Sequence, residues 1–269
     1  AVVGEWEVYG RHLTPDATPA GSVVVVHGMV VAGMGIRPLA RELVGRGLAV
    51  HVPDLPGFGR SGKPRRALDV DGLADALAGW MAVSGLEGSS LLGNSFGTQV
   101  AVAAVERHPD LTGPLALLSP TIDRRFRRGW AGRLPPGRPG GRPASGVLGW
   151  VQRQAVERLL PADEQVETPS LRSLLLTEYA AAGPARALST YRHALRDDIA
   201  GRLVRVANPV LVLRGERDGL VSPEWARSLA GLAGGRYAEI AGADHDAQYH
   251  RPHAVADAVV AHLTGGSSR

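Results

Sequence analysis

The chain has 269 residues, of which 44% are hydrophobic and 21% are charged, and its formal net charge is +4 at pH 7. This composition is ordinary for a globular protein with a sizeable core. The absence of cysteine excludes disulfides, thiolate metal sites and a cysteine nucleophile. Nearly all of the positive charge is arginine and only 5% of the residues are aromatic, so the composition does not favour nucleic-acid binding.

No apolar stretch approaches the roughly 20 residues that a membrane-spanning helix needs. The first twelve residues also lack the basic and then apolar layout of a secretory signal peptide. We therefore expect a cytoplasmic protein with no membrane span. The sequence gives no indication of the oligomeric state.

Strand-type and helix-type segments alternate along the first 120 residues. Residues 4–12 alternate polar and apolar side chains, as in an edge strand, whereas the β-branched run in residues 21–28 is typical of a strand buried on both faces. We expect, in chain order, strands at 4–12 and 21–28, a helix at 36–46, a strand at 47–54, a helix at 68–83, a strand at 90–93, a helix at 98–107 and a strand at 113–120. This alternation predicts an α/β fold with a mostly parallel central sheet flanked by helices.

The alternation stops at residue 121 and resumes at residue 206. A loop at 124–146, with seven arginines and no acidic residue, opens the intervening segment. Beyond this loop we expect helices at 147–160, 170–182 and 184–197, a strand at 208–218, a helix at 223–233, a strand at 235–245 and a helix at 252–263. The sequence thus predicts a core made of residues 1–120 and 206–264, a helical insertion at 121–205 and a flexible tail at 265–269.

The segment "LLGNSFGTQV", residues 91–100, places Ser95 between Gly93 and Gly97, after a predicted strand and before a predicted helix. The Gly-x-Ser-x-Gly pattern alone is weak evidence in a chain with 35 glycines. At a sharp strand-to-helix turn, however, a serine hydroxyl is exposed, and the two glycines leave room that a Cβ would fill. The helix N-terminus also favours a developing anion. Ser95 is therefore a candidate nucleophile, whereas the sequence suggests no role for Asn94.

A serine nucleophile needs a base, and the base needs an orienting acid. Asp218 and His245 each stand at the end of a later predicted strand, and they follow the serine in the order acid, then histidine. Glu216 is the nearest rival for the acid. His250 and His253 are rivals for the base, but they fall toward the last predicted helix.

Acyl transfer also needs hydrogen-bond donors for the oxyanion. One candidate is the backbone N–H of Phe96, the residue that follows the serine. The loop after the strand at 21–28 supplies the other, with the N–H of Met29 favoured over that of Val30. We interpret His27 as a structural residue that holds this loop by hydrogen bonds, because Gly28 is the residue that permits the bend.

Five motifs together resemble the α/β-hydrolase fold family. In family order they are "HG" at 27–28, "DLPGFGRS" at 54–61, "GNSFG" at 93–97, "GERD" at 215–218 and "GADH" at 242–245. The resemblance implies an α/β-hydrolase fold in which the insertion at 121–205 forms a helical cap. It also implies a catalytic triad of Ser95, His245 and Asp218 that needs no metal or organic cofactor, and a supporting rather than catalytic role for Asp54.

Two positions depart from the pattern of the family. Asp244 stands where many relatives have a glycine before the triad histidine; we expect it to point to solvent, and it would raise the pKa of His245 if it pointed inward. Asp123, after the strand at 113–120, occupies a place where some relatives keep their acid. Asp123 therefore remains an alternative to Asp218.

The resemblance implies a serine hydrolase but leaves the substrate open. Our leading hypothesis is an enzyme that hydrolyses a small or medium apolar carboxylic ester, lactone or thioester through an acyl-enzyme on Ser95. The "GNSFG" motif also resembles hydrolases that cleave a carbon–carbon bond in a vinylogous diketone, and a non-hydrolytic cyclase or lyase is a further alternative. From a different class, a ligand-binding receptor with a vestigial triad is the remaining alternative.

The cap is expected to line an apolar pocket for a small-molecule substrate. The candidate pocket residues are Val30, Trp130, Trp150, Leu174, Leu175 and Tyr191, and the cap residues among them would alternatively serve only in packing. The arginine-rich loop at 124–142 is either a solvated loop or a surface that attracts an anionic substrate or an acidic carrier protein.

Overall fold

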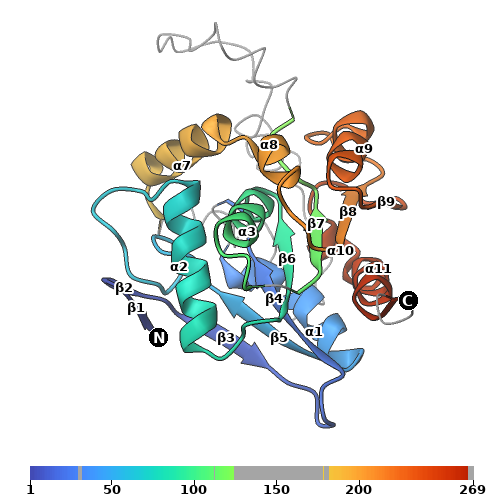
Figure 1. Ribbon diagram of the computed structural model, residues 1–269, viewed down its shortest axis with the longest axis horizontal. Helices are drawn as coiled ribbons and strands as arrows, with labels where there is room; N and C mark the ends of the chain where they lie inside the picture. Colours follow the sequence, from blue (N-terminus) through green and yellow to red (C-terminus); the bar gives the residue numbers. More distant parts are fainter. Residues whose placement is uncertain (30–31, 112, 124–177, 179–181, 266–269) are drawn as a thin grey trace, which may run out of the picture.

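The structure is a computed structural model that describes residues 1–269 except 30–31, 112, 124–177, 179–181 and 266–269 (Figure 1). A seven-stranded sheet forms its centre, with the strand order β3-β5-β4-β6-β7-β8-β9. The strands are β3 (Gly10–Leu13), β4 (Gly21–Val26), β5 (Leu48–Pro53), β6 (Ser90–Asn94), β7 (Leu115–Leu118), β8 (Val210–Gly215) and β9 (Arg236–Ile240). β3 is antiparallel to β5, and every other pair of neighbours is parallel. The predicted mostly parallel sheet is therefore confirmed.

The N-terminal segment differs from the single strand predicted at 4–12. β1 (Val2–Val3) and β2 (Trp6–Glu7) form a separate two-stranded antiparallel sheet, and only β3 joins the large sheet, where it is the edge strand. Gly4, between β1 and β2, has a φ of 56°, which a glycine adopts without the penalty that a side chain would bring. The edge position was predicted correctly, but the alternating pattern did not reveal the turn.

Helices cover both faces of the sheet because successive residues of a buried strand point to opposite sides. Val24 and Val26 of β4 pack into one core, whereas Val23 and Val25 pack into a second core on the other face. The α-helices of the first core are α2 (Val70–Val83), α3 (Phe96–Arg107), α7 (Pro184–Arg196), α8 (Ile199–Leu203) and α9 (Pro223–Leu232), and those of the second are α1 (Arg37–Gly45), α10 (Ala247–His250) and α11 (Pro252–Thr264). Figure 1 shows this three-layer arrangement.

The helix α3 lies in the middle of the first layer, against α2, α8 and β6. All of its residues from Phe96 to Val105 are buried. Small side chains such as Ala101, Ala103 and Ala104 allow this close enclosure on several sides. The N-terminus of α3 is consequently fixed at the carboxyl edge of the sheet, immediately after Ser95.

A long insertion separates β7, which ends at Leu118, from β8, which begins at Val210. In the described part of this insertion, α7 (Pro184–Arg196) matches the predicted helix at 184–197, and no strand occurs. The arginine-rich loop, the predicted helix at 147–160 and most of the one at 170–182 lie outside the described residues. The division into core and cap stays a prediction.

Three short elements were not predicted: η1 (Gly33–Ile36), α8 and α10 (Ala247–His250). Each spans only four or five residues, which is too short for a helical period to stand out in the sequence. Within the described residues, no helix has the length and apolar character required to cross a membrane.

Candidate active site

Ser95 occupies a strained turn between β6 and α3. Its φ of 52° and ψ of −119° lie in a region that costs a non-glycine residue about 1–3 kcal/mol. Hydrogen bonds hold the turn on both sides: the Ser95 N–H donates to the carbonyl of Leu118 at 2.8 Å, and its carbonyl accepts from the N–H of Thr98 at 3.0 Å and the hydroxyl of Thr98 at 2.6 Å. The surrounding sheet and helix thus maintain the strain.

Gly93 and Gly97 provide the space that this turn needs. A Cβ on Gly93 would lie 2.6 Å from the Cα of Thr98, and a Cβ on Gly97 would lie 2.3 Å from the carbonyl oxygen of Val26. Both obstacles are backbone atoms, which do not move aside as the end of a flexible side chain does. Neither position accommodates a side chain while the turn keeps this shape.

The structure brings His245 and Asp218 to the serine hydroxyl. The Nε2 atom of His245 lies 2.9 Å from the Oγ of Ser95, and its Nδ1 lies 3.0 and 3.1 Å from the two carboxylate oxygens of Asp218. An ionised carboxylate only accepts hydrogen bonds, so Nδ1 carries the proton and the Nε2 of a neutral imidazole accepts from the serine hydroxyl. The three residues follow β6, β8 and β9, whose carboxyl ends share one edge of the sheet.

The loop after β8 fixes the carboxylate of Asp218. Its Oδ1 atom accepts the backbone N–H of Leu220 at 2.8 Å and that of Val221 at 3.0 Å. The buried guanidinium of Arg214 donates to the carbonyl oxygens of Asp218 and Val221 at 3.1 and 2.9 Å. Arg214 was not predicted as part of the site, although an arginine within an otherwise apolar strand is a signal that could have identified it.

The electrostatics of the pair favour an ionised acid and a charged imidazole. Burial lowers the pKa of His245, but the charge of Asp218, its hydrogen bond and the charge of Asp246 outweigh burial, so the pKa is raised. Burial raises the pKa of Asp218, but the charge and hydrogen bond of His245 and the N–H of Leu220 reverse this, so the pKa is lowered. The site is therefore arranged to stabilise an imidazolium.

The loop after β4 lies directly against the serine. A Cβ on Gly28 would lie 3.3 Å from the Cβ of Ser95, so the absence of a side chain allows this close approach. Among the described residues, no backbone carbonyl accepts a hydrogen bond from the N–H of Met29 or of Phe96. Val30, the second candidate donor in this loop, lies outside the described residues.

His27 connects this loop to the loop after β5. Its Nδ1 lies 2.8 Å from the carbonyl oxygen of Gly28, and its Nε2 accepts the N–H of Leu55 at 3.0 Å. Because Nε2 accepts a hydrogen bond, Nδ1 carries the proton of a neutral ring. Burial is the main reason that the pKa of His27 is lowered. Through these contacts His27 connects the loop after β4 to the loop after β5.

The rival carboxylates of the sequence have other partners. Asp54 accepts hydrogen bonds from the guanidinium of Arg11 at 2.7 Å and from the N–H groups of Gly33 and Arg60 at 2.9 and 3.0 Å. It therefore connects β3, the start of η1 and the loop after β5. Asp123 accepts the hydroxyl of Ser222, the N-cap of α9, at 2.6 Å.

Glu216, the other rival acid, accepts the N–H of Gly242 at 2.7 Å. The rival bases lie on later elements: His250 is on α10, and His253 on α11 pairs with Glu42 and Asp257 at the surface. Within the described part of the chain, Nε2 of His245 is the imidazole nitrogen that lies at the hydroxyl of Ser95.

Asp246 is a residue of the site region that sequence reasoning missed. We expected Asp244 to point to solvent, and it is exposed. The aspartate on the other side of His245, Asp246, is buried. Its position immediately after the histidine was the available signal, but the sequence does not show which of the two side chains turns inward.

Little of the predicted pocket falls within the described residues. Tyr191 on α7 is half-buried against the core, and burial raises its pKa. The other predicted pocket residues lie outside the described residues: Val30, Trp130, Trp150, Leu174 and Leu175. In the described ranges, no group of three or more histidine, aspartate or glutamate side chains is placed to hold a metal ion.

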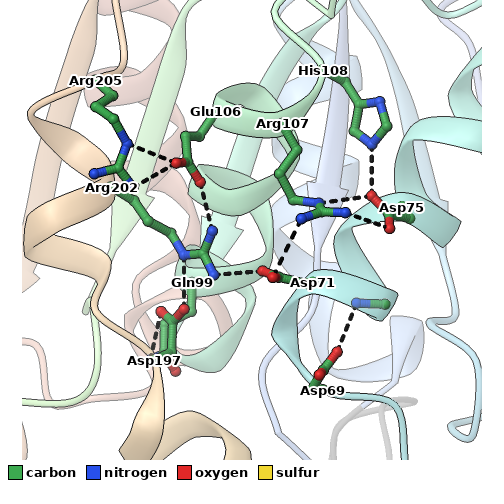
Figure 2. Close-up of polar contacts among 11 residues, drawn as sticks. Asp69, Asp71, Asp75, Gln99, Glu106, Arg107, His108, Asp197, Arg202 and Arg205 are labelled. Atoms are coloured by element: carbon green, nitrogen blue, oxygen red, sulfur yellow. Dashed lines mark hydrogen bonds and ion pairs between the residues drawn. The ribbon is translucent and has the colours of Figure 1, made fainter.

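A cluster of ion pairs attaches the end of the insertion to α2 and α3 (Figure 2). Arg202 of α8 bonds to Asp71 of α2, to Glu106 of α3 and, at 2.8 Å, to Asp197 at the end of α7. Gln99 of α3 also donates to Asp197, at 3.2 Å. We call these five residues the Arg202 cluster. Because α3 begins next to Ser95, the cluster links the insertion to the helix that carries the candidate nucleophile.

The chain is similar to known α/β hydrolases in sequence and in fold. Residues 23–258 match the family described as "Alpha/beta hydrolase family". The chain is 30% identical over 246 residues to a pimeloyl-(acyl-carrier protein) methyl ester esterase from Stenotrophomonas maltophilia, a match that covers 89% of this chain and 88% of the relative.

Solved structures of similar fold include a thermophilic esterase from Thermogutta terrifontis and an enol-lactonase from Burkholderia xenovorans. The esterase is 26% identical with a TM-score of 0.72, and the match covers 97% of this chain and 94% of the esterase. The lactonase is 20% identical with a TM-score of 0.71, and the match covers 98% of this chain and 99% of the lactonase. From its sequence match and its fold, the chain is an enzyme that belongs to the α/β hydrolase family.

Proposed function

We propose that this enzyme hydrolyses carboxylic esters, including lactones or thioesters, with a small or medium apolar acyl group, through an acyl-enzyme on Ser95. The observation that carries the proposal is the continuous series of hydrogen bonds from Asp218 through His245 to the hydroxyl of Ser95. Three such groups in this order activate a serine, because the acid holds the imidazole that takes the proton of the hydroxyl.

The proposed reaction has two halves. Nε2 of His245 takes the hydroxyl proton as the Oγ of Ser95 attacks the carbonyl carbon, and the same imidazolium then protonates the leaving alcohol or thiol. Water, deprotonated by His245, attacks the acyl-enzyme and releases the acid and the free serine. In both halves Asp218 stabilises the imidazolium.

Backbone N–H groups of Met29 and Phe96 would stabilise the tetrahedral oxyanion in each half. Loss of one such donor costs about 3–4 kcal/mol in a well-studied serine protease. Support comes from the close approach of Gly28 to Ser95 and from the absence of a backbone carbonyl partner for either N–H among the described residues. We further propose that the insertion at 121–205 acts as the cap over this site, with Tyr191 among the residues that face the acyl group.

A narrower candidate substrate is a methyl ester on an acyl chain carried by an acyl-carrier protein. The observation that favours it is the similarity of the chain, over 89% of its length, to an esterase of that name. The test compares hydrolysis of the same methyl ester on pantetheine and on a carrier protein. A gain in kcat/KM of tenfold or more for the protein-bound ester supports this candidate, and equal values contradict it.

The proposed mechanism is tested with p-nitrophenyl butyrate and the Ser95→Ala variant. We expect kcat/KM to fall by more than about 10³-fold, because the nucleophile is lost. Ser89→Ala is the matched control: its hydroxyl bonds to Ser22 just before β6, at the opposite end of the strand from Ser95, and this variant should retain activity.

Labelling identifies the nucleophile independently of turnover. A serine-directed fluorophosphonate should attach to the peptide that contains Ser95, as determined by mass spectrometry, and Ser95→Ala should not be labelled. Attachment to any other residue contradicts the proposed nucleophile. If the wild-type protein neither hydrolyses esters nor reacts with the probe, the acyl-enzyme mechanism is wrong.

A further inference from the structure

Arg214 is a charged residue in a strand that is otherwise apolar and buried. It lies near the end of β8, and its side chain is only 5% exposed. Successive residues of a strand point to opposite faces, so Arg214 shares a face with Val210 and Val212, which belong to the first core. Burial of a charge is costly unless the charge is paired and hydrogen-bonded. The polar contacts of Arg214 must therefore compensate for its burial.

The guanidinium of Arg214 holds both ends of the turn that carries Asp218. Its Nη2 donates to the carbonyl oxygen of Asp218 at 3.1 Å, and its Nε donates to that of Val221 at 2.9 Å. Between these two carbonyls lie the N–H groups of Leu220 and Val221, which donate to the Oδ1 of Asp218. Arg214 thus fixes the peptide groups on either side of the two that hold the carboxylate.

The turn at 218–221 contains a glycine, which makes external contacts important for its shape. Gly219 is exposed, and a Cβ at this position would meet no atom within 4 Å. Glycine restricts its own backbone less than any other residue. After the turn, the hydroxyl of Ser222 donates to Asp123 at 2.6 Å and anchors the chain there. The contacts of Arg214 therefore restrain the segment in between, where the glycine permits movement.

Glu239 on the neighbouring strand holds Arg214 in turn. The two residues lie opposite each other in the parallel pairing of β8 with β9, and Nη1 of Arg214 lies 2.8 Å from the Oε1 of Glu239. The side chain of Glu239 is 33% exposed and also accepts the hydroxyl of Tyr237. Hydrogen bonds from Tyr237 and from Arg214 lower the pKa of Glu239, so an ionised carboxylate supplies the counter-charge of the buried guanidinium.

We propose that Arg214 is a positioning residue for the candidate acid: by fixing the turn at 218–221 it sets the place of the Asp218 carboxylate at Nδ1 of His245, and Glu239 holds Arg214 in that position. The inference rests on the proposed function, in which Asp218 orients the imidazole. The action of Arg214 runs through the backbone of the turn. A carboxylate on the edge strand of the sheet is thereby connected to the geometry of the nucleophile and its base.

The first test measures kcat and KM for p-nitrophenyl butyrate in Arg214→Lys. Lysine keeps a positive charge for Glu239, but its single ammonium does not reproduce the planar fork of a guanidinium. We expect kcat to fall about 10- to 100-fold, the scale of a slightly misplaced catalytic group, and KM to stay within about twofold, as for a residue that does not bind substrate. Arg217→Met is the matched control: Arg217 is an exposed arginine of the same loop, and this variant should match the wild type.

A double variant distinguishes positioning from a general loss of stability. If Arg214 acts through Asp218, then Arg214→Lys should lower kcat by less than about twofold more when Asp218→Asn is already present, because effects on one shared group do not add. All assays are run well below the Tm of every variant. An equal loss in both backgrounds, or a lower Tm with unchanged kcat in Arg214→Lys alone, overturns the inference.

Glu239→Gln is a second variant that serves if Arg214→Lys does not fold. Glutamine keeps a hydrogen-bond acceptor at this partly exposed position but removes the counter-charge of Arg214. We expect kcat to fall about two- to tenfold, the scale of one weakened hydrogen bond, with KM unchanged. The control is Glu224→Gln, at an exposed acid on α9. Equal values of kcat in these two variants contradict the connection from Glu239 to the acid.

NMR of the Nδ1 proton of His245 separates this inference from the proposed function, because it needs no turnover. In the Ser95→Ala background, this proton should exchange with solvent at least about fivefold faster in Arg214→Lys than in Arg217→Met, since its acceptor is held less firmly. Faster exchange in a protein without serine-dependent hydrolysis would support the positioning and contradict the proposed function. Equal exchange rates overturn the inference, even if the wild-type protein is an active esterase.

Discussion

Replacement of Arg202 by methionine should destabilise the protein in a manner that depends on pH. Arg202 holds Asp197, whose side chain is 1% exposed, and methionine retains an apolar side chain without the charge (Figure 2). Without the guanidinium, Gln99 remains as a hydrogen-bond partner of Asp197, but the buried carboxylate loses its counter-charge. A buried charge deprived of its partner costs about 3–5 kcal/mol.

The lower end of that range applies because Gln99 still donates to Asp197. The pair between Arg202 and Asp71, whose side chain is 43% exposed, adds less than about 1 kcal/mol. We therefore expect the free energy of unfolding to fall by about 3 kcal/mol at pH 7. For a chain of this length, this loss corresponds to a decrease in Tm of about 5 °C.

The sign of the pH dependence follows from Asp197. Burial raises its pKa, and Arg202 opposes this, so removal of Arg202 raises the folded-state pKa further above the unfolded value. The penalty of Arg202→Met should be largest above the folded-state pKa of Asp197 and should shrink as the pH falls through it, because the protonated acid needs no counter-charge. Asp197→Asn in the Arg202→Met background should recover most of the loss at pH 7.

Urea unfolding followed by circular dichroism at pH 7 and pH 5 measures these effects. Arg205→Met is the matched control: Arg205 follows the same helix, its side chain is 60% exposed and it pairs with Glu106, so its loss should cost less than about 1 kcal/mol. A loss for Arg202→Met that equals the control, or that is the same at both pH values, refutes the reasoning.

Two further variants test the geometry of the site. Gly97→Ala places a Cβ 2.3 Å from a backbone oxygen of β4; we expect a loss of stability of at least about 1–3 kcal/mol and a loss of esterase activity, whereas unchanged Tm and activity contradict the assigned turn geometry. Asp218→Asn removes the acceptor that fixes the proton on Nδ1 of His245, so kcat/KM should fall about 10³–10⁴-fold. The charge of Asp218 also helps to raise the pKa of His245. The acidic limb of the pH profile for the remaining activity should therefore move to lower pH. Retention of more than a tenth of the activity would show that another acid serves His245.

The fold was predictable because its signals are local. The β-branched run of β4 and the helical spacing of the apolar residues in α2 each fall within a short stretch of sequence. Both patterns are expected for elements that are buried at the faces of a sheet. The proximity of Ser95, Asp218 and His245 was also predictable from parallel strands, since their carboxyl ends meet at one edge. Their catalytic roles stay predictions.

Other features depend on contacts that no short window contains. The Arg202 cluster joins Asp71 to Arg202 across 131 positions of the sequence, and the charge pattern of each helix alone is that of a solvated surface. Which aspartate beside His245 turns inward depends on the turn that precedes α10. The split of the predicted strand at 4–12 reflects a tight turn, which an alternating polar and apolar pattern does not encode.

The hydroxyl of Ser95 and the imidazole of His245 are 150 positions apart in the chain, and the contact forms only when β6 through β9 stand side by side. In that series, β7 pairs with β8 across the long insertion, with Leu115 opposite Val210. A contact of such high sequence separation costs loop-closure entropy before it contributes stability. During refolding, recovery of turnover therefore reports the completed assembly of this half of the sheet, whereas helix formation, seen by circular dichroism, precedes it.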